Sequence, residues 1–154
     1  MYKRQIQNLR KDLSIKLGSK IDPTDPDSPT YYDTLSRGEL PNISKEIPRY
    51  SLANMQKELA SNRPVDNVYN EFISNCLNKD IYILDGVKRD VYITGNDDEI
   101  LYKNRESIVI LYLPGHYELI GIIDDNNIHT LFDPEDDFIQ RIKTRMQQLH
   151  TLQS

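Results

Sequence analysis

The spacing of apolar residues divides the chain into segments with strand-like and helix-like patterns. Residues 108–113 are apolar at every position, which is typical of a strand that is covered on both faces. Residues 117–123 return after Pro114 and Gly115, so the two segments predict a hairpin. Three shorter β-rich runs are separated by turn residues: 81–84, 91–93 and 100–102. The hairpin and the first of these runs are predicted to form the centre of a small, mostly antiparallel sheet.

Other segments carry apolar residues at spacings of three and four, which predicts helices that bury one face: residues 1–17, 67–77 and 134–149. Gly18 follows the first as a C-terminal stop signal. Asp133 as N-cap and Pro134 as the first helical residue introduce the last one, and its end from Thr151 is expected to fray. Ser51 is predicted to cap a shorter helix, and Asp66 to cap the helix at 67–77.

Residues 19–50 interrupt these patterns. Five of the eight prolines lie between Pro23 and Pro48, among Asp, Ser and Thr, which predicts a long irregular loop. The acidic stretch from Asp22 to Asp27 lacks the glycine and late glutamate of an EF-hand, so no calcium site is predicted. Strands and helices within 154 residues predict a single α+β domain, residues 1–154, with the loop at 19–50 and a C-terminal helix at 134–150.

The candidate chemistry lies at the start of the return strand. Side chains two positions apart on a strand share a face, so His116 and Glu118 are expected to point the same way and Tyr117 the opposite way. A carboxylate in that position can hold the imidazole in one tautomer, as a general base requires. The plainer alternative is a solvated histidine beside a turn.

Several segments, in this order, resemble the C-terminal half of an ovarian-tumour (OTU) type cysteine protease, similar to the OTU-like proteins of large DNA viruses. They are the helix at 67–77, the strand at 80–84, the run Asp90-Val91-Tyr92 and the strand at 108–113 that leads to Gly115-His116-Tyr117-Glu118. The resemblance implies a papain-like fold and makes His116 the general base, with Glu118 at the position of the residue that orients it. It also implies ubiquitin or a ubiquitinated protein as the partner.

The nucleophile of that family is missing from the matching segments. The family carries it in an Asp-Gly-x-Cys-like motif before a helix near the start of the domain, and the chain is expected to begin after that point. The single cysteine, Cys76, lies on the apolar stripe of the helix at 67–77. Burial in apolar surroundings raises the pKa of a thiol, so Cys76 is predicted to be a core residue.

Composition narrows the choice of partner and compartment. Twenty-four acidic and 19 basic residues give a formal charge of −5, and no basic patch alternates with aromatic residues, so nucleic acid is not expected as a partner. The single cysteine excludes internal disulfides, and no apolar run is long enough to span a bilayer. A cytoplasmic location is therefore predicted; if the protein is viral, the corresponding locations are the host cytosol or the virion. His129, His150 and the acidic run at 97–99 lack a ligand pattern, so neither a metal nor a cofactor is predicted.

Three functions stay open at this point. The first is a thiol-dependent deubiquitinase domain that hydrolyses ubiquitin isopeptide bonds and is inactive alone because its cysteine lies elsewhere. The second is an OTU-like pseudoenzyme that binds ubiquitin or another protein without catalysis. The third is a viral-type interaction domain with no ubiquitin contact.

Overall fold

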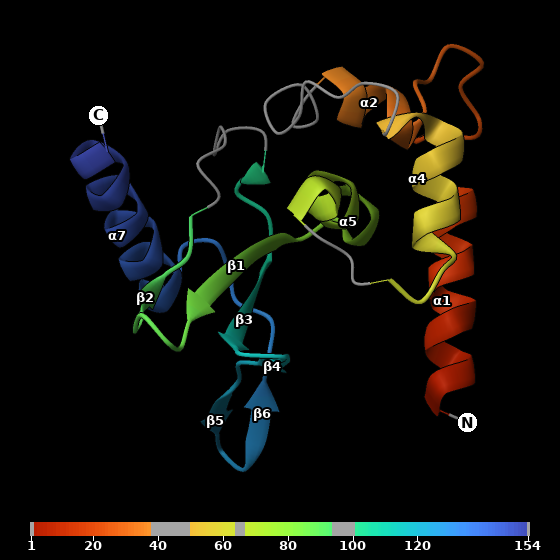
Figure 1. Cartoon of the computed structure of the whole chain (residues 1–154). Coiled ribbons are helices and arrows are strands. Elements are labelled where there is room, and N and C mark those ends of the chain that lie inside the picture. Colours follow the sequence, from red (N-terminus) through yellow and green to blue (C-terminus); the bar gives the residue numbers. More distant parts are fainter. Residues whose placement is uncertain (1, 38–49, 64–66, 94–100, 154) are drawn as a thin grey trace. The chain divides into compact units, whose positions relative to one another are not determined.

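The computed structural model describes residues 2–37, 50–63, 67–93 and 101–153. The chain forms two compact units, residues 1–75 and 76–154, and each is described by itself (Figure 1). The described residues contain five α-helices and a small mixed sheet, so the α+β class is confirmed. The single domain and its OTU-like identity stay predictions.

The first unit is built from helices: α1 (Tyr2–Leu17), α2 (Tyr31–Arg37), α4 (Leu52–Leu59), the 3-10 helix η2 (Asn67–Tyr69) and most of α5 (Asn70–Leu77). α1 and α4 lie side by side (Figure 1). Arg10 Nε donates to the Leu59 carbonyl at 2.8 Å, and Ser14 and Gln56 exchange two hydrogen bonds of 2.8 and 3.0 Å. These bonds fix the register of the two helices. The buried apolar residues of the unit are Leu17, Leu35, Met55, Leu59, Val68, Tyr69 and Phe72.

Most helix predictions in this unit are confirmed, with two corrections. α1 ends at Leu17 before Gly18, and Ser51 caps α4 by accepting from Asn54 N at 3.3 Å. The predicted stripe of α1 is only partly buried, since Leu9 is 57% exposed. The segment at 19–50 is also less irregular than predicted, because α2 lies within it. Residues 38–49 and the predicted cap at residue 66 lie outside the described residues.

The helix α2 has a start signal that the proline content obscured. Thr30 N donates to Asp33 Oδ2, and Asp33 N donates to Thr30 Oγ1, both at 3.0 Å. This reciprocal pair is a capping box, which satisfies two of the donors that a helix N-terminus leaves without intrahelical partners. A polar residue followed three positions later by a carboxylate was the available sequence signal.

The second unit contains a four-stranded sheet in the order β2-β1-β3-β4, formed by β2 (Asp90–Val91), β1 (Asp80–Asp85), β3 (Ser107–Leu113) and β4 (His116–Leu119). β1 and β3 are parallel, while β2 and β4 are antiparallel to their neighbours. The prediction of central positions is right for β1 and β3 and wrong for the return strand, because β4 lies at an edge. The strand predicted at 91–93 ends at Val91, and Leu101 and Tyr102, from the run predicted at 100–102, are not in a strand. Residues 94–100 lie outside the described residues.

The predicted return strand at 117–123 is also shorter than expected. β4 ends at Leu119, and Ile120 N still donates to Val109 O at 2.9 Å. The chain then leaves the sheet as a two-stranded ribbon, β5 (Ile122–Asp124) and β6 (Asn127–His129). It comes back where Ser107 and Phe132 exchange hydrogen bonds of 2.7 and 2.9 Å. The ribbon is therefore an excursion between two neighbouring points of β3.

The core of this unit lies between the sheet and helix α7 (Asp137–Gln153). Its buried members are Tyr82, Val109, Phe132, Ile139, Ile142 and Met146. The N-cap of α7 lies three residues later than predicted: Asp136 Oδ1 accepts from Phe138 N at 2.9 Å, whereas Asp133 Oδ1 accepts from Glu135 N in the preceding turn. The helix continues to Gln153, past the predicted end at residue 149, and the fraying expected from Thr151 stays a prediction.

Candidate functional site

The candidate site is the start of β4, directly after the hairpin turn. The ring of Pro114 restricts its φ to about −65°, and Gly115 has a φ of +68°. This combination matches a type II turn, which needs a positive φ at its second central position. The turn makes His116 the first residue of β4, opposite Leu113.

The predicted geometry of the pair is present. His116 Nε2 lies 3.2 Å from Glu118 Oε1, within hydrogen-bond distance. With Nε2 donating to the carboxylate, the lone pair of the ring lies on Nδ1, which is the atom that would accept a proton. The two side chains are 59% and 56% exposed, so solvent reaches the pair freely. Their catalytic role stays a prediction.

The hydrogen-bond ladder explains how this exposed pair is held. The bond from Ile120 N to Val109 O marks a bonded pair of the antiparallel ladder, and bonded pairs recur at every second residue. His116 and Glu118 are therefore in bonded pairs, with their backbone groups directed at β3. The backbone N–H and C=O of Tyr117 point to the open edge of the sheet. The imidazole and carboxylate thus stand on a backbone fixed on one side only.

The neighbouring Tyr117 lies on the other face, as predicted, and packs against Tyr112 with ring centroids 5.3 Å apart. It is nevertheless 63% exposed, and Leu119 on the same face is 57% exposed. Sequence reasoning placed Tyr117 on this face but did not name Leu119, and all four residues of β4 are exposed. The alternation His-Tyr-Glu-Leu was the available signal for the shared face of Tyr117 and Leu119.

Cys76 is half-buried, in partial agreement with its predicted core position. It precedes β1 by four residues, and the first residue of β1 pairs with Ser107 at the start of β3. His116 pairs with Leu113 at the end of β3. At ~3.3 Å per residue, the six steps between those pairs span roughly 20 Å. Cys76 is therefore next to the opposite end of the sheet from the imidazole and is not placed to serve it as a nucleophile.

No group of three or more His, Cys, Asp or Glu side chains among the described residues could hold a metal ion. The acidic run at 97–99 lies outside those residues. None of the helices in the described ranges is long and apolar enough to cross a membrane.

Comparison with known proteins leaves the resemblance untested. No family model matches the chain, and no curated protein matches it.

Proposed function

We propose that the chain is an OTU-like domain that binds ubiquitin or a ubiquitin conjugate and does not cleave it alone. The observation that carries the proposal is the pair itself, His116 Nε2 and Glu118 Oε1 at 3.2 Å, on a strand that follows a tight turn. A carboxylate two residues after a histidine is the arrangement that the family resemblance implies for a general base and its orienting residue.

The same geometry defines what the pair would do if a cysteine were supplied by another segment or another chain. Nδ1 of His116 would take the thiol proton, and the thiolate would attack the carbonyl carbon of the isopeptide bond. The protonated imidazole would then give its proton to the departing lysine amine, while Glu118 stabilises the imidazolium. Removal of the attacking sulfur leaves no covalent step, so the 154-residue chain is expected to be inactive alone.

The position of Cys76 supports the non-catalytic part of the proposal. Its place near the start of β1, at the far end of the sheet from His116, separates the single thiol of the chain from the imidazole that Glu118 contacts. The negative formal charge of the chain suits the basic C-terminal tail of ubiquitin that the resemblance implies.

A ubiquitin titration followed by isothermal calorimetry tests the binding. We expect saturable binding that weakens at least fivefold in His116→Ala and is unchanged in His129→Ala, a control that removes another exposed imidazole of the same unit. No binding of ubiquitin, or equal binding by both variants, would contradict the proposal.

A ubiquitin carrying a C-terminal electrophile tests the catalytic part, with intact mass as the readout. We expect no adduct with the wild-type chain. An adduct lost in both Cys76→Ala and His116→Ala would show that Cys76 is a nucleophile after all. An adduct formed only with an added polypeptide that contains the Asp-Gly-x-Cys motif would instead favour the catalytic alternative, in which the chain is the histidine-bearing half of a working protease.

A further inference from the structure

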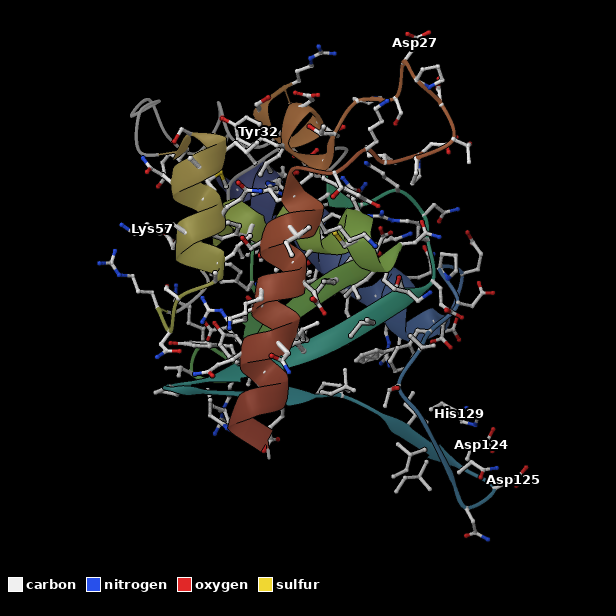
Figure 2. All side chains as sticks on the ribbon, turned by 90° about the vertical axis from the view of Figure 1, so that its right-hand side faces the viewer. Asp27, Tyr32, Lys57, Asp124, Asp125 and His129 are labelled. Carbon is white, nitrogen blue, oxygen red and sulfur yellow. The ribbon has the colours of Figure 1, made fainter. Side chains whose placement is uncertain are left out.

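The segment that contains the ribbon has an unusual charge pattern. No lysine or arginine occurs between Arg105 and Arg141, and eight acidic residues lie in this interval. They are Glu106, Glu118, Asp124, Asp125, Asp133, Glu135, Asp136 and Asp137. Two of them, Asp124 and Asp125, stand at the end of the β5–β6 ribbon (Figure 2).

The ribbon has a defined shape. Asp125 and Asn126 have φ of 46° and 68°, as the two central residues of a type I′ hairpin turn require. At the base of the ribbon, a Cβ on Gly121 would come within 2.8 Å of Ile128 Cγ2 and 3.3 Å of His129 O. Only glycine leaves room for the two chains to approach so closely there. The base is further anchored by the bonds of Ile120 and Phe132 to β3.

The ribbon exposes apolar side chains that the rest of its unit does not cover. Ile123 and Ile128 are a directly opposed cross-strand pair, which puts both on one face, and they are 75% and 70% exposed. A two-stranded hairpin is only marginally stable in water unless another element packs on it. Its edges also lack the lysine or proline that protects strand edges from pairing with other chains.

We propose that the ribbon is a docking surface for an extended basic segment of another protein. Aliphatic side chains of that segment pack on Ile123 and Ile128, and its cationic side chains lie beside Asp124 and Asp125. The argument for this occupant is charge complementarity: the apolar pair lies in a stretch of sequence with eight acids and no lysine or arginine, and two of those acids, Asp124 and Asp125, lie at the end of the same ribbon. The site is distinct from the His116–Glu118 pair and does not depend on the proposed ubiquitin binding.

A second copy of the chain fits this surface less well. A second copy that used the same ribbon would bring a second pair of aspartates and no lysine or arginine of its ribbon to the interface, and like charges across an interface are unfavourable. A basic segment avoids this repulsion between carboxylates, and its cationic side chains attract Asp124 and Asp125 instead.

Fluorescence anisotropy with labelled ten-residue peptides tests the proposal, using the full chain. An alternating lysine–valine peptide is expected to bind and to weaken as salt is raised, because its charges face acids. An alternating glutamate–valine peptide is expected not to bind, and oligolysine to bind at least tenfold more weakly than the lysine–valine peptide.

Matched variants separate the apolar and charged parts of the surface. The double variant Ile123→Thr and Ile128→Thr keeps β-branched side chains and is expected to bind the lysine–valine peptide at least tenfold more weakly. Val87→Thr, which changes an exposed β-branched residue elsewhere in the same unit, is expected to bind like wild type.

The charged part of the surface has its own pair of variants. Asp125→Asn is expected to reduce both the affinity for the peptide and its salt dependence, whereas Glu135→Gln, at another exposed acid, is expected to change neither. His116→Ala is expected to bind the peptide normally.

Several results would overturn the proposal. Absence of lysine–valine binding, equal binding of oligolysine, or wild-type binding by both the double isoleucine variant and Asp125→Asn would each do so. Sedimentation velocity decides the other occupant: a wild-type dimer that the two isoleucine substitutions dissociate would assign the surface to a second copy of the chain.

Discussion

Substitution of Asp80 is predicted to be the most damaging single change in the second unit. Asp80 is fully buried at the start of β1, where its carboxylate accepts from Arg105 Nε at 2.8 Å and Arg105 N at 3.1 Å. It also accepts from Lys103 N at 3.1 and 3.2 Å. The carboxylate thus joins the first residue of β1 to the segment that leads into β3, at the point where the parallel pairing begins.

The magnitude follows from burial. The side chain of Asp80 is 1% exposed and that of Arg105 13%. Removing the carboxylate therefore takes away a buried acceptor that Arg105 Nε and two backbone N–H groups share, while the bond from Arg105 to Leu101 O is kept. Loss of one partner of such a buried pair costs about 3–5 kcal/mol of folding free energy. With a denaturant slope of about 1–3 kcal/mol per molar urea, Asp80→Ala should lower the unfolding midpoint by at least about 1 M.

Urea unfolding followed by far-ultraviolet circular dichroism measures this shift. Glu106→Ala is the matched control, because Glu106 lies next to Arg105 and forms a 3.0 Å ion pair with Lys79 in which the side chains are 49% and 26% exposed. An exposed pair contributes about 0–1 kcal/mol, so the control should shift the midpoint by at most about a third as much. Equal shifts in the two variants would refute the reasoning that burial makes the Asp80 carboxylate decisive.

Two further predictions concern helix α7. The Arg145 guanidinium donates to Asp90 at 2.7 and 2.9 Å, and this hydrogen bonding lowers the pKa of Asp90 from 3.8 to about 2. A carboxyl group whose pKa is lower in the folded than in the unfolded state stabilises the fold at pH values above the unfolded pKa, so the stability from this pair should be lost as the pH falls from about 4 to about 2. Urea midpoints measured across that range should fall less steeply for Arg145→Gln than for the wild-type chain. Equal slopes for the two proteins would contradict the role given to the Asp90–Arg145 pair. Asp136→Ala should lower the free energy of unfolding by about 1 kcal/mol, because it removes the N-cap of α7. Urea unfolding at neutral pH measures this change. A larger decrease in Asp133→Ala would show that Asp133 is the true cap.

Much of the local structure was predictable because it depends on neighbouring residues. The period of the apolar positions placed α1 and β3, and the Pro114-Gly115 pair placed the hairpin turn. Period-two alternation alone put His116 and Glu118 on one side of a strand, and their 3.2 Å contact follows from that spacing.

Two of the errors in the sequence predictions share one cause. The signal for the start of α7 was misplaced by three residues because Asp133 and Asp136 both precede an apolar run and both cap a backbone N–H. The return strand was extended through Gly121 because the apolar run continues to Ile123, although the backbone pairing with β3 stops at residue 120. In each case, two local solutions fitted the same residues.

The sequence by itself determined the elements with a clear period, the turn that separates β3 from β4, and the shared face of the histidine and the glutamate. These features arise from backbone geometry over a few residues, so the chain encodes them locally. Tertiary structure alone decided that β1 pairs with β3 in parallel, that β4 is an edge, that Asp80 is buried and that Ile123 and Ile128 are exposed. Each of these features depends on which distant segments of the chain pair with a given strand or pack on a given apolar side chain. Strand propensity varies with those neighbours, so the sequence alone does not predict which segments come together.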